Sequence, residues 1–356
     1  MHTRLSRRST SNVRQRVYAA LKSFFEVAEK STAHPLERRI MQAIKEYTLR
    51  PGAKRTRGML VVLGFLSNRR NKITRDILTM AAAYEVLHAY LLIHDDIIDD
   101  DVMRRGGPTL HKVFESFAPQ ALSRYGREKI GRDLSIIAGD MVADLVQRCL
   151  FSTHFSTKQK ISALEAIERT LQTTYLGQVL DILALPQKVP PFRQQILRYQ
   201  LKTAVYTIEA PFMLGASLGR ARINGKKFNE FARQAGVAFQ LSDDLQNVFS
   251  QGLAGRSSDI RSGKITLLVS FALQSRRHRY LLLRLLSKKK KAVRDIAKVK
   301  ELLVKSGGYE RARRYAIDSF RRASVLLDQL EIPRLVKMEF QALVQKINIG
   351  NNNKST

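Results

Sequence analysis

The feature that most constrains this chain is a run of acid set into an apolar helical stretch. Five of the seven positions from 95 to 101 are aspartate, and leucine and isoleucine residues lie among and before them. On a helix, Asp95 and Asp99 stand one turn apart on the same face, where like charges repel. A solvated acidic surface fits poorly, because the apolar neighbours point to a buried interior and acids at a helix C-terminus oppose the macrodipole. The pattern therefore predicts a site for a hard cation such as Mg²⁺.

The rest of the chain predicts an almost entirely α-helical protein. Apolar residues recur at helical spacing, as in MAAAYEVLHAYLLIHDDIID and QQILRYQLKTAVYTIEAPFMLGASLG. Glycine (19) and proline (9) are few for 356 residues, and the alternating pattern of β-hairpins is hard to find. A chain of this length can bury a large core in one domain or two.

The two ends of the chain differ in composition from the helical region, which we place at 15–345. Residues 1–14 are basic, Ser-rich and free of acid, and we expect a flexible arm there. Their composition also fits an organellar leader, but a helical pattern begins soon afterwards at VYAALKSFFEVAEK, so we expect cytoplasmic residence. The tail at 346–356 is expected to be disordered. The Gly- and Ser-rich stretch 250–264 is expected to form a loop or lid beside an anionic ligand.

The chain carries 62 Lys+Arg against 31 Asp+Glu, a formal charge of +31. Such an excess fits nucleic-acid binding, attraction to anionic membranes or substrates, or a generally basic background. It is spread along the chain, with local clusters at 276–279 and 288–291, and no nucleic-acid motif with interleaved aromatics is recognisable. We therefore expect no nucleic-acid partner and a weak association with anionic membrane surfaces.

Cysteine content and hydropathy bound the environment further. The single cysteine, Cys149, excludes an internal disulfide and suits a reducing compartment. Even the most apolar region, 81–98, contains Glu85, His88 and several aspartates, so we expect no transmembrane segment.

A second aspartate pair, Asp243 and Asp244, lies in the helical stretch GVAFQLSDDLQNVF. Two acidic helices could face each other across a bundle and hold several Mg²⁺ ions around one diphosphate. Basic residues that could complete such a cage are Lys54, Arg55, Arg57, Arg104, Arg105, Lys202 and Lys264.

Taken together, the motifs resemble those of the trans-isoprenyl diphosphate synthases, also called polyprenyl synthetases. The resemblance covers most of the chain, and its eight segments stand in the family's order: GAKRTR at 52–57, HAYLLIHDDIID at 88–99, RRGGPT at 104–109, AGD at 138–140, GQVLDI at 177–182, KTAVYT at 202–207, FQLSDD at 239–244 and SDIRSGKIT at 258–266. It implies a single large helical bundle of the isoprenoid synthase type around a central apolar cavity, and a homodimer.

The resemblance also implies roles for individual residues. Asp95, Asp96 and Asp99 would form the first aspartate motif, with Asp95, Asp99 and Asp243 as ligands of about three Mg²⁺ ions. The allylic diphosphate would be contacted by Arg104, Lys202 and Lys264. The diphosphate of isopentenyl diphosphate would be held by Lys54, Arg57, His88 and Arg105. The metals, the substrates or the developing charge would be supported by Gln178, Asp181, Thr203 and Gln240.

The activity implied is the Mg²⁺-dependent head-to-tail condensation of isopentenyl diphosphate with an allylic diphosphate. Product length in this family depends on bulky residues just before the first motif. Tyr90 lies five positions before Asp95, roughly 7 to 8 Å along a helix, and could block the growing tail, whereas Leu91 is not aromatic. This combination resembles geranylgeranyl diphosphate synthases, with farnesyl diphosphate as the alternative product. An ordinary core aromatic is the alternative explanation of Tyr90.

Three positions depart from the family pattern, and two other functions compete with the one it implies. Asn247 stands where many relatives have a third aspartate, Gly58 replaces a common proline, and Arg256 stands where a lysine often occurs. An ionisation-type terpene cyclase also uses an acidic helix, but it has no need of an isopentenyl diphosphate pocket such as Lys54 and Arg57 would supply. A non-enzymatic basic scaffold is supported by charge alone and gives the ordered motifs no purpose.

Overall fold

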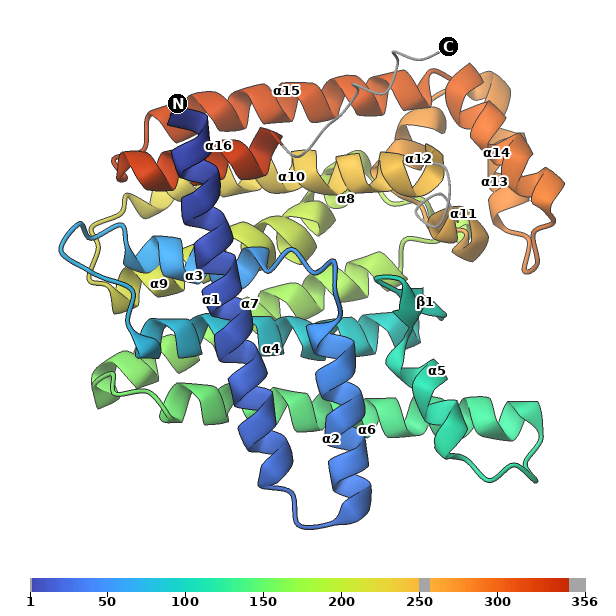
Figure 1. Cartoon of the computed structure of the whole chain (residues 1–356). Coiled ribbons are helices and arrows are strands. Elements are labelled where there is room, and N and C mark those ends of the chain that lie inside the picture. The colour runs from blue at the N-terminus through green and yellow to red at the C-terminus, as the bar shows by residue number, and fades with distance from the viewer. Residues whose placement is uncertain (1, 250–256, 346–356) are drawn as a thin grey trace. The chain divides into compact units, whose positions relative to one another are not determined.

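The computed structural model describes residues 2–249 and 257–345, and most of them are helical (Figure 1). The α-helices are α1 (His2–Lys30), α2 (Pro35–Leu49), α3 (Thr56–Phe65), α4 (Arg75–Ile98), α5 (Leu110–Phe114), α6 (Arg124–Phe151), α7 (Thr157–Ile182), α8 (Phe192–Tyr199), α9 (Ala210–Leu218), α10 (Gly225–Phe249), α11 (Ser258–Ser262), α12 (Leu267–Ala272), α13 (Arg276–Leu286), α14 (Val293–Lys305), α15 (Gly308–Asp328) and α16 (Arg334–Gln345). Three further helical segments are the 3₁₀ turns η1 (Glu115–Phe117) and η2 (Pro186–Lys188) and the π-helix η3 (Gln200–Glu209).

Within the described ranges, β structure is limited to one short antiparallel hairpin. Its strands are β1 (Met103–Arg104) and β2 (Gly107–Pro108), with Arg104 opposite Gly107. The predicted all-α class is confirmed.

Contacts divide the chain into two compact units. Unit 1 contains Met1–Ala166 and Pro211–Arg222, and unit 2 contains Ile167–Ala210 and Ile223–Thr356. The dividing points therefore fall inside α7, at the start of α9 and before α10. The expected arrangement of a single bundle around a central cavity stays a prediction.

Unit 1 is built around α4, which packs against α1, α3, α5 and α6. The hydroxyl of its N-cap, Thr74, accepts a hydrogen bond from the backbone N–H of Ile77. By length and composition alone, α4 could cross a bilayer. Sixty-one per cent of its most apolar window is buried inside the protein, however, and the core helix of a globular unit passes the same test.

Two glycines let α3 and α9 approach each other closely within unit 1. A Cβ atom added at Gly215 of α9 would lie 1.9 Å from the carbonyl oxygen of Val61, and one added at Gly64 of α3 would lie 2.0 Å from that of Phe212. The obstacles are backbone atoms, which cannot turn aside as a side chain can. Only glycine permits this contact.

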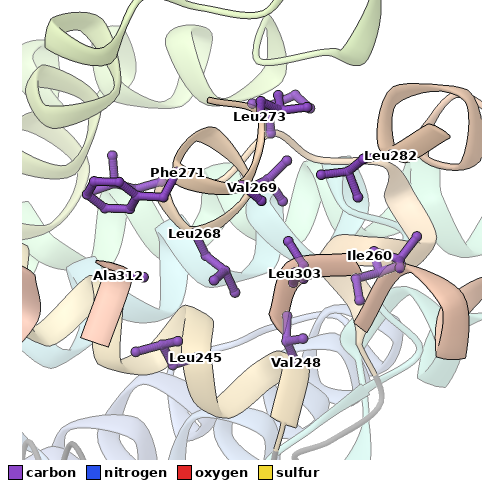
Figure 2. Close-up of a cluster of buried hydrophobic side chains, with 14 of the residues drawn as sticks. Leu245, Val248, Ile260, Leu268, Val269, Phe271, Leu273, Leu282, Leu303 and Ala312 are labelled. Atoms are coloured by element: carbon purple, nitrogen blue, oxygen red, sulfur yellow. The ribbon is translucent and has the colours of Figure 1, made fainter. Parts of the chain in front are cut away.

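The core of unit 2 surrounds the C-terminal half of α10 (Figure 2). Leu245 and Val248 of α10 meet side chains from α11 to α15, including Ile260, Leu268 and Leu303. Because these apolar residues are fully or nearly fully buried, they fix α10 and the 257–273 segment together. Both carry candidate site residues.

Two predictions about the ends and loops need correction. Helix α1 begins at His2, so residues 2–14, expected as a flexible arm, are helical. The prediction began the helix where the apolar pattern began, but arginine and small polar residues can extend a helix once it is nucleated. In the expected loop at 250–264, residues 258–262 form α11. The other part of that loop, 250–256, and the predicted disordered tail at 346–356 lie outside the described residues.

We expect the Gly215→Ala substitution to lower the free energy of unfolding by about 2 to 3 kcal/mol, since the added methyl group forces two backbones apart. Gly126→Ala, in the first turn of α6, is the matched control, because its Cβ would meet only the Leu122 and Ser123 side chains at 3.4 Å or more. Urea unfolding of both variants measures the difference. A Gly215→Ala variant as stable as Gly126→Ala would contradict the close contact.

Candidate active site

The first aspartate motif occupies the C-terminal end of α4 and the residues just after it. The backbone N–H of Asp99, the C-cap, donates to the carbonyl of Asp95 at 2.8 Å, and Asp100 takes a left-handed conformation with φ 54° that turns the chain. Burial raises the pKa of Asp101 to about 6, and the charges of Asp96 and Asp99 add to this effect. The carboxylates are thus crowded at a helix end where the macrodipole is also negative.

The second aspartate of this motif is locked in place. Asp96 is 1% exposed, and its Oδ2 accepts a hydrogen bond of 2.7 Å from the hydroxyl of Tyr47 on α2. Its Oδ1 accepts from Nε of Arg104 at 2.7 Å and also from Nη2. Burial raises the pKa of Tyr47, and the neighbouring Asp96 raises it further, so its hydroxyl stays a donor. Asp96 therefore positions Arg104 and has few lone pairs left for a metal.

Asp95 and Asp99 could supply the carboxylate ligands of a Mg²⁺ site. Both are partly exposed and lie one turn apart at the helix end. Across residues 2–249 and 257–345, no group of three or more His, Cys, Asp or Glu side chains forms a ready-made metal site. Mg²⁺ commonly binds through one or two carboxylates and completes its shell with water and substrate phosphate. Two oxygen donors at a crowded acidic end match that pattern.

A cluster of basic groups lies beside the motif in unit 1. Nη1 of Arg57, on α3, lies 3.2 Å from Nε2 of His88 on α4, and Nη2 of Arg105 lies 3.4 Å from the same atom. Because guanidinium groups only donate, Nε2 must be the acceptor. Burial, Arg57 and Arg105 lower the pKa of His88 well below its ordinary value. The imidazole is therefore neutral, and two positive charges converge on it.

The β1–β2 hairpin presents Arg104 and Arg105 to these neighbours. Arg105 (φ 52°) and Gly106 (φ 77°) form the turn in the left-handed region. Nη1 of Arg50 donates to the carbonyls of Arg104 at 2.7 Å and Pro108 at 2.9 Å, one on each strand. This clamp fixes a hairpin that is too short to be stable alone.

Arg55 belongs to the framework of the site. Its Nη2 donates to the carbonyl of Thr48 at 2.7 Å, and its Nη1 lies 3.5 Å from Oε2 of the buried Glu85. Oε1 of Glu85 accepts a 2.9 Å hydrogen bond from the backbone N–H of Gly58. A proline at position 58 has no N–H and would lose this bond, which gives a physical reason for the departure at Gly58.

In unit 2, three cations surround one buried carboxylate. Oδ2 of Asp181, on α7, lies 2.7 Å from Nζ of Lys202 and 2.7 Å from Nζ of Lys264, and Oδ1 lies 3.5 Å from Nη1 of Arg198. Burial alone would raise the pKa of Asp181, but Lys202, Lys264 and Arg198 outweigh it and hold the pKa well below its usual range. Three cations thus gather on one carboxylate, an arrangement that suits a bound anion.

The π-helix η3 brings Lys202 against α7. A Cβ atom at Gly177 of α7 would lie 2.8 Å from the backbone nitrogen of Lys202, so the absence of a side chain there allows the approach. π-Helical turns are rare and are frequent at functional sites. Arg198, just before η3, also donates to the carbonyl of Ile265 at 3.1 Å, beside Lys264.

A hydrogen-bond chain leads from η3 to the second aspartate motif. The hydroxyl of Thr203 donates to Oε1 of Gln240 at 2.6 Å, and Nε2 of Gln240 donates to Oδ1 of Asp244 at 3.0 Å. The hydroxyl of Tyr199 donates to Oδ2 of Asp244 and accepts from the backbone N–H of Leu267 at 2.9 Å. Burial raises the pKa of Asp244 to about 6.

The two motifs therefore share one arrangement. In each, the second aspartate is buried and bonded to a buried tyrosine, Tyr47 for Asp96 and Tyr199 for Asp244. The first aspartate is the more accessible one, with Asp95 partly exposed and Asp243 exposed.

The departure at Asn247 also has a local explanation. Its Nδ2 donates to the hydroxyl of Ser258 at 2.9 Å, and its carbonyl accepts from the backbone N–H of Ser257 at 3.2 Å. An ionised aspartate could not donate to the Ser258 hydroxyl and could only accept from it. Asn247 thus attaches the start of α11 to the end of α10.

The other predicted site residues lie on the same helices or next to them. Lys54 is exposed in the loop before α3, and Gln178 is partly exposed on α7, three residues before Asp181. Tyr90 is partly buried on α4, where its ring packs edge-on against His94 with centroids 4.9 Å apart. Leu91 is also partly buried. Since Asp95 and Asp243 belong to different units, their sharing of one diphosphate stays a prediction.

Sequence reasoning missed three residues: Tyr47, Arg198 and Tyr199. Tyr47 lies in a helix without an aspartate motif and gave no signal. Arg198 and Tyr199 immediately precede the segment that starts at Lys202. The available signal was the presence of these two polar side chains, Arg198 and Tyr199, in an amphipathic helix next to the KTAVYT motif at 202–207.

Comparison with known proteins points to one family. The profile of the family described as Polyprenyl synthetase matches residues 38–303. The short chain isoprenyl diphosphate synthase of Methanocaldococcus jannaschii is 26% identical over 74% of this chain and 72% of its own length. The farnesyl diphosphate synthase of Haemophilus influenzae is 30% identical over 66% of this chain and 74% of its own.

A solved structure is similar over nearly the whole chain. It is the geranylgeranyl pyrophosphate synthase of Corynebacterium glutamicum complexed with isoprenyl diphosphate and magnesium, with a TM-score of 0.83 and 27% identity. The match covers 93% of this chain and 96% of that one. This chain belongs to the polyprenyl synthetase family.

We expect Tyr199→Phe to lower the free energy of unfolding by about 2 kcal/mol, because Asp244 and the N–H of Leu267 each lose a buried partner. Tyr280→Phe removes the same hydroxyl from a side chain that is 77% exposed, and we expect a change within about 0.5 kcal/mol. Chemical denaturation of the two variants compares them. Equal stabilities would show that the Tyr199 hydroxyl does not hold the second motif.

Proposed function

We propose that this protein is a Mg²⁺-dependent prenyltransferase that condenses isopentenyl diphosphate head-to-tail with an allylic diphosphate, giving a short all-trans prenyl diphosphate, geranylgeranyl diphosphate above all. The observation that carries the proposal is the pairing of acid and base in each unit. Each unit has an aspartate motif with one accessible and one locked carboxylate, together with a cluster of cations, at Arg57 and Arg105 in unit 1 and at Lys202 and Lys264 in unit 2.

The two cation clusters suit the two diphosphates of this reaction. Arg57 and Arg105 would turn from the neutral His88 onto the diphosphate of isopentenyl diphosphate, with the exposed Lys54 closing over it. Lys202, Lys264 and Arg104 would hold the allylic diphosphate. Bound Mg²⁺, on Asp95, Asp99 and Asp243, would act as a Lewis acid on the departing diphosphate.

The reaction then follows from charge. Lysine and arginine side chains neutralise the diphosphate as the allylic C–O bond breaks, and the carbon skeleton is left as a delocalised cation. The double bond of isopentenyl diphosphate, fixed by Arg57 and Arg105, attacks that cation. Loss of a proton to the released diphosphate restores an allylic product. The locked geometry of Asp96 and Asp244 keeps the charged groups oriented throughout.

Gln178, Thr203 and Gln240 are proposed to support the substrates and the developing charge. The hydrogen bond between Thr203 and Gln240 orients the side-chain amide of Gln240 beside the second motif. We further propose about three Mg²⁺ ions per site, a homodimer and cytoplasmic residence. The first two statements rest on the family resemblance, and the third rests on the early start of the helical pattern and the single cysteine.

Product length is proposed to depend on Tyr90, with Leu91 as its neighbour. The ring of Tyr90 is held edge-on by His94, which in turn packs on Gly139 of α6, where a Cβ would lie 2.1 Å from the imidazole. A ring braced in this way can act as a fixed floor. Farnesyl diphosphate, the product named for the Haemophilus relative, is the alternative.

The activity test is incubation of the purified protein with labelled isopentenyl diphosphate, an allylic primer and Mg²⁺. We expect elongated linear diphosphates, and Asp95→Asn should lower kcat/KM by about 100-fold or more, because a metal-binding charge is lost. Asp133→Asn, a half-exposed aspartate that pairs with Lys129 on α6, is the matched control and should retain activity. Absence of linear products, or hydrocarbon formation from geranylgeranyl diphosphate, would refute the proposal.

Tyr90→Ala should shift the products to chains at least one isoprene unit longer, because the floor beneath the tail is removed. Chromatography of the dephosphorylated products measures their length. Tyr125→Ala, at a tyrosine that is 78% exposed on α6, controls for the loss of a ring. An unchanged distribution in the Tyr90 variant would assign Tyr90 to ordinary packing.

A further inference from the structure

Helices α13 and α14 of unit 2 carry a concentration of positive charge that the proposed site does not use. Residues 276–305 contain twelve lysines and arginines and two acids, Asp295 and Glu301. Roughly a twelfth of the chain thus supplies an excess of ten charges out of the total of +31. A general basic background does not explain so local an excess.

The two acids are already engaged with three of the lysines. Oδ1 of Asp295 lies 2.6 Å from Nζ of Lys288, and Glu301 lies 2.9 Å from Lys298 and 2.7 Å from Lys305. The exposed cations that make no ion pair with another described residue are Arg276, Arg277, Arg279, Arg284, Lys289, Lys290 and Arg294. They lie on α13, at the start of α14 and in the loop between these helices, and we call this set the α13–α14 surface.

Exposed apolar side chains lie among these cations. Tyr280 of α13 is 77% exposed and stands one helical turn from both Arg276 and Arg284. Leu281 is 37% exposed, and Val293, at the start of α14, is 80% exposed. The opposite face of α13 is buried in the core of unit 2 through Leu282, Leu285 and Leu286. Helix α13 is therefore held along one side and presents cations with an aromatic ring on the other.

We propose that the α13–α14 surface docks this protein on an anionic lipid membrane. Phosphate groups of lipids or of a nucleic acid would both attract the cations. Aliphatic side chains such as Leu281 and Val293 cannot stack on nucleic-acid bases. They can, together with the ring of Tyr280, insert at the headgroup level of a bilayer, so the exposed apolar residues favour a membrane. The need for docking rests on the proposed function, because the prenyl chain of the product is poorly soluble in water. Docking itself can be measured without turnover.

The experiment is flotation of the full-length protein with vesicles of phosphatidylcholine alone and with vesicles containing roughly a third phosphatidylglycerol. We expect binding to the second kind only, weakened by added salt. Arg276→Gln combined with Arg277→Gln should lower the vesicle affinity about 30-fold, equivalent to ~2 kcal/mol at 1.4 kcal/mol per factor of ten.

The matched control is Arg69→Gln combined with Arg70→Gln, which removes two adjacent exposed arginines from the α3–α4 loop of unit 1. It should leave vesicle binding near that of the original protein. Prenyltransferase activity on soluble primers should be unchanged in both double variants, so a failed activity assay and a failed flotation are separate results. Equal loss of vesicle binding in the two variants would overturn the proposal. So would binding to an RNA or DNA duplex without binding to anionic vesicles.

Discussion

The hydrogen bond from a buried tyrosine to the second aspartate of each motif is the constraint on which the candidate site depends. Neighbouring carboxylates repel each other, and this repulsion destabilises a helix end that carries them. A hydrogen bond that stabilises one of the carboxylates offsets the cost. Tyr47 and Tyr199 do this for Asp96 and Asp244. Since burial keeps both phenols protonated, each stays a donor, and in each motif the first aspartate is the more accessible member of the pair. The two aspartate motifs therefore use the same tyrosine–aspartate hydrogen bond.

Residues 198–203 connect the parts of unit 2. Arg198 and Lys202 turn toward Asp181, while Tyr199 and Thr203 turn toward Asp244 and Gln240. The same segment holds the chain at 265–267 through a carbonyl and an N–H group. The excess cations and the second aspartate motif are thus fixed by one short stretch of helix. Its π-helical winding carries Lys202 close to α7 at Gly177, and a regular α-helix would direct successive side chains differently.

The sequence was sufficient to predict the all-α class and the acidic and basic motifs, because helical periodicity and the crowding of carboxylates are local signals. It could not predict that Arg55 would form an ion pair with Glu85, that Asn247 would donate a hydrogen bond to Ser258, or that Tyr47 would donate one to Asp96. These pairings join residues that are distant in sequence or ambiguous in role, and only packing decides them. The α1 start at His2 shows a different limit, since helix extension by basic residues leaves no apolar pattern to read.

On the proposed assignment, the neutrality of His88 makes the two cation clusters unequal as binding sites for a diphosphate. When a diphosphate replaces the imidazole as partner of Arg57 and Arg105, an uncharged acceptor is exchanged for a strongly charged one, and attraction increases. Lys202 and Lys264 instead trade one anion, Asp181, for another, so the net gain is smaller and reversal is easier. On the proposed assignment, the retained substrate meets the cluster with the larger gain. The leaving group meets the cluster that releases an anion more easily, so inorganic pyrophosphate departs while the diphosphate of the product stays on Arg57 and Arg105.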